Sequence, residues 1–299
     1  MAATWRARWY QDSASSEARE TGAVSDGALT DRELLGQGRE AEIYAWDDGL
    51  VLRLFRTAEL QERLERESVA MRAAAECGVP VPRVEESITV DGRPGLLLER
   101  VDGPDLITLF GRRPWLVPRL VRTVGILHTQ MHAAVAPPEL EDLQVRVRRR
   151  IGDVRGNMLP TDLADFALER LEGLPVGDRL CHGDFHPGNV LLGSDGPRVI
   201  DWTATTRGHP MADVARTCLM LTVGEAEPSM PALVRRMDKF GRAVIVRWYL
   251  RAYRRRAPID DDLMSRWQVV RAADRMSEGI VGEYPKLIAL LRRAADAAS

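Results

Sequence analysis

The stretch that decides the fold is His182-Gly183-Asp184-Phe185-His186-Pro187-Gly188-Asn189, followed by an apolar strand that ends in Val199-Ile200-Asp201. Glycine and proline favour an irregular loop over a helix in the first part. The pattern therefore predicts a loop that carries Asp184 and Asn189, with a hairpin presenting Asp201 opposite. A carboxylate can orient a hydroxyl group and accept its proton, and carboxylate and amide oxygens suit magnesium, so this set is typical of phosphoryl transfer.

This loop resembles the catalytic loop of aminoglycoside phosphotransferases and related small-molecule kinases, which share the protein-kinase fold. Ile200-Asp201-Trp202 is similar to the metal-binding motif of that fold. The resemblance implies that Asp184 is the catalytic base and that Asn189 and Asp201 bind Mg²⁺. Protein kinases proper carry His-Arg-Asp and Asp-Phe-Gly at these two places, so Gly183 and Trp202 argue against that branch.

Two features of the N-terminal half resemble the nucleotide-binding lobe of the same family. Leu35-Gly36-Gln37-Gly38 precedes a strand and is similar to the glycine loop that covers the nucleotide, which assigns Gly36 and Gly38 to nucleotide binding. On residues alone, a plain turn explains two glycines equally well. Glu67 lies where the family has its ion-pairing glutamate, although Glu65 is a rival and a surface charge is the alternative.

Two further segments extend the resemblance on either side of the catalytic loop. Leu98-Glu99-Arg100-Val101-Asp102-Gly103 is similar to the hinge between the lobes, where the backbone at Glu99 and Val101 would bind adenine. A strand edge that runs into a turn is the alternative. Arg207-Gly208-His209-Pro210-Met211-Ala212-Asp213 also resembles the family, and Asp213 is expected to brace the catalytic loop.

The strand Val51-Leu52-Arg53-Leu54-Phe55 departs from the family pattern, because Arg53 stands where the phosphate-contacting lysine is expected. Of the 42 basic residues only Lys239 and Lys286 are lysines, so no lysine in the first lobe can substitute. Arginine keeps the positive charge but is longer and forked. Neither lysine follows a glycine, which excludes a Walker A loop.

Hydrophobic periodicity predicts an α+β arrangement of a small β-rich N-lobe and a larger helical C-lobe. The resemblance implies that this arrangement is the bilobal, protein-kinase-like fold. Short strands alternate with turns at Asp48-Gly49 and Asp91-Gly92, and helical spacing runs from Glu59 to Glu76. Helical spacing dominates after Gly103. The predicted boundaries are a flexible N-terminal tail over 1–28, the N-lobe over 29–100 and the C-lobe over 101–299.

Composition limits the partners and the compartment. The net charge of −2 provides no global field for nucleic acid or an anionic membrane. No run approaches the ~20 apolar residues of a transmembrane helix. Three widely spaced cysteines form neither a disulfide framework nor a C-x-x-C metal pair. These features predict a cytoplasmic protein that binds neither nucleic acid nor membrane.

Three charged or metal-ligating patterns carry weaker hypotheses. His128 and His132 stand four apart and could bind zinc, although packing in a helix core is the favoured interpretation. Asp274 and Glu278 share a helix face that could capture a cationic acceptor, or they could form intrahelical pairs with neighbouring arginines. A solvated helix face is expected for the arginine run Arg146, Arg148, Arg149 and Arg150.

Together the residues and the resemblance predict an ATP- and Mg²⁺-dependent kinase of a small hydroxyl-bearing molecule. The acceptors of the family include aminoglycosides and other antibiotics, amino alcohols, sugars and amino acids. A kinase of an ordinary metabolite is one alternative. A nucleotide-binding pseudokinase is another, suggested by Arg53 and opposed by the joint presence of Asp184, Asn189 and Asp201.

Overall fold

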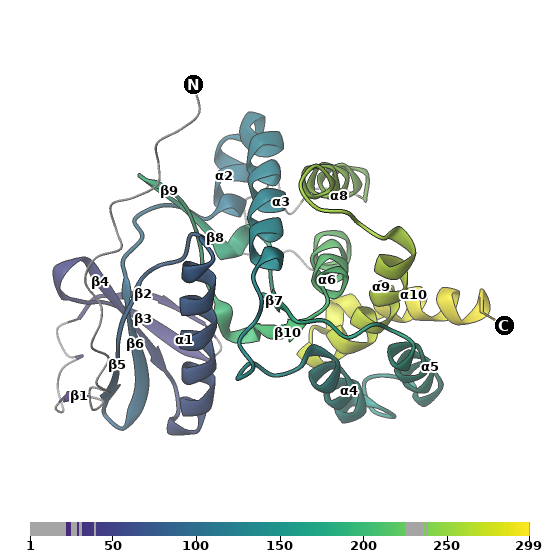
Figure 1. The fold of residues 1–299 in the computed structure, drawn as a ribbon, viewed down its shortest axis with the longest axis horizontal. Helices are drawn as coiled ribbons and strands as arrows, with labels where there is room; N and C mark the ends of the chain where they lie inside the picture. The colour runs from purple at the N-terminus through teal and green to yellow at the C-terminus, as the bar shows by residue number, and fades with distance from the viewer. Residues whose placement is uncertain are drawn as a thin grey trace.

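The computed structural model describes residues 22–24, 29, 32–38, 40–224, 232, 236 and 239–298, and it has two lobes (Figure 1). Within these residues the N-lobe sheet has six strands in the order β1-β5-β6-β4-β3-β2. β1 runs parallel to β5, and the other neighbours are antiparallel. The strands are β1 (Gly22–Val24), β2 (Leu34–Gln37), β3 (Ala41–Ala45), β4 (Leu50–Phe55), β5 (Val84–Val90) and β6 (Arg93–Glu99).

Alternation along β4 places a charge on the inner face of this sheet. Leu52 and Leu54 are fully buried on the outer face, where they pack with Ile88, Val90 and Leu97. Successive side chains of a strand point to opposite faces. Arg53 therefore points the other way, toward helix α1 (Gln61–Glu76), whose Glu67 it contacts.

Helix α1 covers the inner face of the sheet because its buried residues recur every three or four positions. These residues are Leu64, Glu67, Ser68, Ala70, Met71 and Ala74. Two residues after the helix, Gly78 has a φ of +76°, a conformation that glycine adopts without a Cβ penalty. The helix predicted from Glu59 thus begins at Gln61, after a 3₁₀ turn over Ala58–Leu60.

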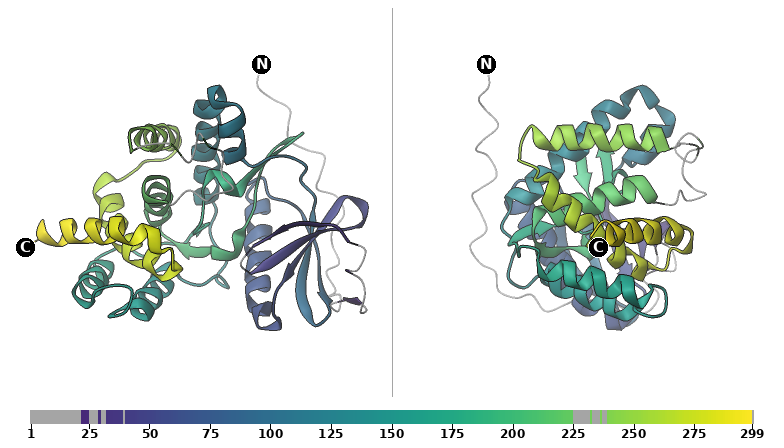
Figure 2. Two further views of the ribbon diagram at one scale, coloured as in Figure 1. Left: turned by 180° about the vertical axis from the view of Figure 1, so that it is seen from behind. Right: turned by 90° about the vertical axis from the view of Figure 1, so that its right-hand side faces the viewer.

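The C-lobe consists mainly of helices, and Figure 2 shows them on the side of the molecule away from the N-lobe sheet. Two short antiparallel pairs, β7 with β10 and β8 with β9, lie between them and the N-lobe. The strands are β7 (Arg179–Cys181), β8 (Val190–Gly193), β9 (Gly196–Val199) and β10 (Thr206–Gly208). The helices are α2 (Leu106–Arg112), α3 (Val117–Ala133), α4 (Leu143–Val154), α5 (Thr161–Glu172), α6 (Pro210–Val223), α8 (Lys239–Arg254), α9 (Asp261–Arg275) and α10 (Tyr284–Asp296).

The predicted α+β arrangement of a β-rich lobe followed by a helical lobe is confirmed. Residues Gly22–Val24, within the range assigned to a flexible tail, form β1 at the edge of the sheet. The rest of that range, 1–21 and 25–28, lies outside the described residues. Among the helices in the described part of the chain, none combines the length and the apolarity needed to cross a bilayer.

Candidate active site

The loop between β7 and β8 places Asp184 beside Asn189. The side-chain amide of Asn189 donates to the backbone carbonyl of Asp184 at 2.9 Å, and its nitrogen lies 3.5 Å from Asp184 Oδ2. The backbone N–H of Ile200 donates to the carbonyl of Asn189 at 3.0 Å. The structure therefore brings the predicted base and both predicted metal ligands together, since Asp201 directly follows Ile200.

Gly183 has a steric reason to be glycine. Its φ is +78°, and a Cβ at this position would lie 2.2 Å from the carbonyl oxygen of Ala204. The neighbouring His182 ring ties the loop down further: Nε2 donates to the Ile200 carbonyl at 3.1 Å, and Nδ1 accepts from the Asp184 N–H at 3.3 Å. A larger residue between His182 and Asp184 would push the catalytic loop away from the segment that holds Asp201.

Asp213, near the start of α6, holds this loop through hydrogen bonds to its backbone, as the resemblance implied. Its Oδ2 accepts from the backbone N–H of His182 at 2.7 Å, and its Oδ1 accepts from the N–H of Gly183 at 3.0 Å. Asp213 is fully buried. Burial raises its pKa, but hydrogen bonds from His128 and His132 outweigh burial and hold the pKa well below the usual range.

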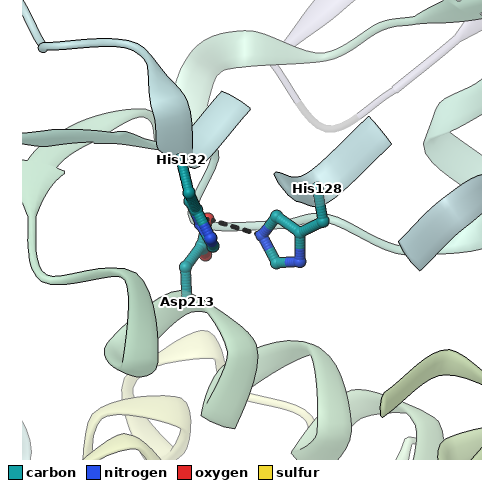
Figure 3. Close-up of side chains that lie close together, drawn as sticks. All are labelled: His128, His132 and Asp213. Carbon is teal, nitrogen blue, oxygen red and sulfur yellow. Dashed lines mark hydrogen bonds and ion pairs between the residues drawn. The ribbon is translucent and has the colours of Figure 1, made fainter. Parts of the chain in front are cut away.

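The two histidines of α3 converge on the same carboxylate (Figure 3). His128 Nε2 and His132 Nε2 lie 3.1 and 3.4 Å from Asp213 Oδ2. Because a carboxylate only accepts, each Nε2 donates. The other ring nitrogens meet hydroxyl groups of α8, at 2.6 Å for His128 with Tyr249 and 2.7 Å for His132 with Tyr253.

These contacts decide between the two interpretations of the histidine pair. Burial and the neighbouring His132 ring lower the pKa of His128 to about 4, so His128 is neutral at pH 7 and its Nδ1 accepts from Tyr249. Every ring nitrogen and both carboxylate oxygens are engaged in hydrogen bonds. The set His128, His132 and Asp213 has the composition of a metal site, but its donor atoms hold the catalytic loop, as expected for core packing.

Asp201 follows β9 in a left-handed backbone conformation, with φ 62° and ψ 66°. Non-glycine residues seldom adopt this conformation, and it recurs at functional sites. The Thr203 hydroxyl donates to Asp201 Oδ1 at 2.9 Å, and the guanidinium of Arg53 donates to the same oxygen at 3.1 Å. Burial raises the pKa of Asp201, but the Arg53 charge and the hydrogen bond from Thr203, together with the neighbouring histidines, outweigh burial, so the net shift of the pKa is downward.

Arg53 joins Asp201 to the N-lobe. Its Nε lies 3.2 Å from Glu67 Oε2, so one guanidinium serves two carboxylates. Glu67 is the buried glutamate of α1, whereas Glu65 is exposed and bonds to Gln61. Glu67, rather than its rival, therefore makes the ion pair that was expected, with arginine in place of lysine.

The segment compared with a glycine loop spans β2 and the residue after it, and the segment compared with a hinge starts at the end of β6. Gly36 belongs to β2, and a Cβ built on it would meet no atom within 4 Å, so the packing of the lobe does not require glycine there. Gly38 donates its N–H to Ala41 O at 2.8 Å. The Glu99 N–H donates to Arg83 O at 2.9 Å, and Val101 follows in the segment that joins the lobes.

Arg216 is a site residue that the sequence analysis missed. It lies one turn after Asp213 on α6, and its guanidinium nitrogen NH2 lies 3.2 Å from Asp184 Oδ1. A signal was present in the sequence: Arg216 is the single charge between Val214 and Val223, an otherwise uncharged helical stretch. A buried charge in such a stretch requires a partner.

Asp274 and Glu278, considered for the capture of a cationic acceptor, are already paired with arginines. Asp274 is fully buried, and the Glu278 side chain is 18% exposed. Their partners are Arg150, Arg216, Arg271 and Arg275. The alternative of pairing with arginines is therefore the correct one, and it extends beyond the neighbours on α9 to α4 and α6.

The arginine run of α4 is solvated only in part. Arg148 and Arg149 are about half exposed, as predicted, with side-chain exposures of 50% and 58%. Arg146 and Arg150 stand four apart and flank the buried stripe of the helix instead. Arg146 donates to the Ala204 carbonyl at 2.7 Å, and Arg150 pairs with Asp274 at 3.0 Å. The prediction of a solvated face is wrong for these two residues.

Comparison with known proteins places this site in a family. A model described as the phosphotransferase enzyme family matches residues 31–259. Acyl-CoA dehydrogenase family member 10 from Mus musculus is 26% identical over 178 residues, which is 52% of this chain and 16% of that protein. The chain thus matches a small part of that relative's length.

Solved structures of aminoglycoside phosphotransferases share the fold. The apo form of a thermostable mutant of APH(4)-Ia superposes with a TM-score of 0.63 at 18% identity, covering 89% of this chain and 95% of that one. The GDP complex of aminoglycoside 2'-phosphotransferase-IIIa gives 0.59 at 17%, covering 92% and 95%. Aminoglycoside-3'-phosphotransferase of type VIII gives 0.56 at 20%, covering 80% and 92%.

These likenesses confirm the predicted bilobal, protein-kinase-like fold. The family match extends over the N-lobe, the catalytic loop and the first C-lobe helices, which is well over half of the sequence. The chain therefore belongs to the phosphotransferase enzyme family.

Proposed function

We propose that this phosphotransferase moves the γ-phosphoryl group of ATP to a hydroxyl group of a small molecule. The observation that carries the proposal is a series of contacts from Asp184 to Asn189 and from Asn189 to the backbone of Ile200. The next residue, Asp201, continues the series to Arg53 and Glu67. Related structures support a nucleotide donor: a mutant of APH(4)-Ia has been solved with AMP-PNP and hygromycin B.

Asp184 is assigned the role of base in this proposal. Its side chain is 31% exposed, so an acceptor can reach it from solvent. Oδ1 is engaged by Arg216, which leaves Oδ2 to orient the acceptor hydroxyl and take its proton. A positioned base contributes about 10²–10⁴-fold to such a reaction.

Asn189 and Asp201 are assigned to Mg²⁺, and the donor set fits that ion. Mg²⁺ takes oxygen ligands and is usually held by one or two carboxylates together with substrate phosphates. Asn189 uses its amide nitrogen on Asp184, which leaves its Oδ1 for a cation. Asp201 has Oδ2 in addition to the oxygen that Arg53 and Thr203 engage. When bound, the ion would supply charge neutralisation at the phosphates.

The N-lobe residues are assigned to the nucleotide itself. Arg53 would contact phosphate oxygens, with Glu67 holding its guanidinium in place. The backbone at Gly36 and Gly38 can approach phosphates closely because no Cβ intervenes. The backbone at Glu99 and Val101 would meet the adenine edge, as in the hinge that this segment resembles.

The test is a transfer assay on the purified protein with MgATP and a panel of aminoglycosides, amino alcohols, sugars and amino acids. GTP is included as donor because one structural relative binds GDP. We expect ADP release that depends on one acceptor, and a loss of about 10²–10⁴-fold in kcat in Asp184→Asn with MgATP binding retained. Asp195→Asn, in the exposed turn of the β8–β9 hairpin, is the matched control. Near wild-type turnover in Asp184→Asn would contradict the assignment.

A binding-only role is the second candidate, and one observation favours it. The guanidinium of Arg53 forms an ion pair, at 3.1 Å, with Asp201, the carboxylate that is assigned to the metal. If this contact persists with nucleotide, binding without transfer would follow. Acceptor-dependent ADP release by the wild type decides against that role, and its absence across the panel together with measurable nucleotide binding decides for it.

A further inference from the structure

Arg216 connects the proposed base to the last helices of the chain. Its guanidinium reaches Asp184 on one side and Glu278, at the end of the 3₁₀ turn η6 (Met276–Glu278), on the other. We propose that Arg216 is a positioning residue for Asp184, and that Asp274 and Glu278 hold Arg216 in place for this task. The inference rests on the proposed function, because it assigns Arg216 a role through the base.

The contact distinguishes the two carboxylate oxygens of Asp184. Arg216 NH2 lies 3.2 Å from Oδ1. Oδ2 has looser neighbours, the amide nitrogen of Asn189 at 3.5 Å and His186 Nε2 at 3.8 Å. One oxygen is thus fixed by a buried cation and the other remains for the acceptor. A guanidinium is rigid and planar, so it restrains the carboxylate rotamer.

The position of Arg216 is itself fixed from the opposite side. Its side chain is 3% exposed, and NH2 is shared between Asp184 Oδ1 and Glu278 Oε1. NH1 lies 3.7 Å from Asp274 Oδ2. A buried guanidinium with carboxylates on two sides cannot swing toward solvent without leaving charges unpaired, which is costly in a protein interior.

Charge balance in this cluster includes the base. The ion pairs among the described residues of this cluster link four guanidinium groups to four carboxylates, and one of the four carboxylates belongs to Asp184. The arginines are Arg150, Arg216, Arg271 and Arg275, and the carboxylates are Asp184, Asp274, Glu278 and Glu283. Asp184 is therefore the more exposed end of a cluster of ion pairs that reaches from the catalytic loop to the helices beyond residue 260.

The experiment compares two buried arginines of the same cluster. Arg216→Met removes the contact with Asp184, whereas Arg271→Met removes a guanidinium that pairs with Asp274 at 3.0 Å instead of with Asp184. With the acceptor found in the panel, we expect Arg216→Met to lower kcat by up to about 10²-fold, the cost of a misplaced catalytic group. KM for MgATP should stay within about twofold. Arg271→Met should keep kcat, and Arg216→Lys should recover part of the loss.

A second comparison separates positioning from general loss of structure. If Arg216 acts through Asp184, Arg216→Met should change kcat by less than about twofold in an Asp184→Asn background, because the two residues form one unit. The same factor in both backgrounds, or an equal kcat loss in Arg271→Met, would overturn the proposal. If Arg216→Met does not fold, Glu278→Gln replaces it, with a smaller kcat loss expected in the wild-type background and none in Asp184→Asn.

If the wild type transfers phosphate to none of the acceptors in the panel, the proposed function fails. The contact between Arg216 and Asp184 can still be tested by urea unfolding of the wild type, Asp184→Asn, Arg216→Met and the double variant. Non-additive losses of stability support the hold of Arg216 on Asp184, and additive losses overturn it.

Discussion

Two sets of ion pairs flank the catalytic loop, and they differ in their supply of positive charge. On the N-lobe side, Arg53 is the one cation of the described residues that pairs with the carboxylates of Glu67 and Asp201. On the C-lobe side, four arginines face four carboxylates, with Arg216 at the contact with the loop. Among the residues that the structure describes, the N-lobe set has one cation for two carboxylates, whereas the C-lobe set has four cations for four carboxylates.

The pKa shifts of one glutamate from each set express this difference. Burial raises the pKa of Glu67 to about 7, although Arg53 lowers it. Burial also raises the pKa of Glu278, but Arg216, Arg275 and Arg150 outweigh it and bring the pKa down to about 2. A set that lacks a cation suits the binding of one, and a complete set suits a permanent support.

The largest expected effect tests whether the C-lobe set is the structural one. Arg271→Met leaves the fully buried Asp274 short of one partner, and breaking such a pair costs about 3–5 kcal/mol. Arg53→Met should lower the free energy of unfolding by less, because Glu67 already has a pKa of about 7 and can take a proton at little cost. Urea unfolding at pH 7 measures both variants, and equal losses would remove the distinction.

The next effect concerns the cation that the N-lobe set lacks. Asp201→Ala removes one of the few carboxylates on which a magnesium ion relies. We expect the Mg²⁺ concentration for half-maximal activity to rise about tenfold or more, equivalent to ~1.4 kcal/mol. Asp195→Ala, in the exposed turn of the same hairpin, serves as control. Superimposable magnesium titrations for a folded Asp201→Ala would reject Asp201 as a ligand.

A smaller effect is expected when lysine replaces Arg53, the cation that Glu67 and Asp201 share. Arg53→Lys keeps the charge, so activity should be preserved or improved, within about threefold of the wild type. Arg53→Met should raise KM for MgATP by about tenfold, because the phosphate contact is lost. Steady-state kinetics on both variants supplies the comparison. Loss of activity in Arg53→Lys would mean that the fork itself, which bridges Glu67 and Asp201, is required.

The smallest expected effect is a pH dependence of the free energy of unfolding, which should have opposite signs for Glu278 and Glu67. Glu278 has its pKa lowered to about 2, so its contribution to stability is present above about pH 4.5 and is lost as pH falls toward 2. Glu67 has its pKa raised to about 7, so the wild type should lose stability relative to Glu67→Gln as pH rises from about 4.5 to 7.

Urea unfolding of the wild type, Glu278→Gln and Glu67→Gln across this range measures the two differences in stability. Slopes of the same sign for both glutamates would contradict the contrast between a complete set and a deficient one.

Much of the site could be predicted because its residues are close in sequence. Asp184 and Asn189 lie on one short loop, and Asp201 follows the next hairpin. Loops and hairpins of this length bring their ends together whatever surrounds them, so the spacing in the sequence was enough to predict that these three residues lie close together. The ion pair of Glu67 was located by resemblance, and burial distinguishes it from Glu65.

The C-lobe support could not be predicted in the same way. Arg216 and Glu278 are 62 positions apart, and their contact depends on how α6 packs against α9 and η6. On a helix drawn from sequence, Asp274 and Glu278 share a face, but the pattern does not say whether that face meets solvent or a neighbour. Arg150 was misplaced for the same reason, since it borders the buried stripe of α4.

The paired bonds from His128 to Tyr249 and from His132 to Tyr253 have a consequence for motion. They fasten α3 to α8 at two points one helical turn apart, and Asp213 extends the same bonding to the backbone of the catalytic loop. We therefore expect α3, α6, α8 and the backbone of the catalytic loop to move together. Any separation of the two lobes would therefore leave the loop of Asp184 attached to the C-lobe helices, and the contact between Arg53 and Asp201 is the one that we expect to open.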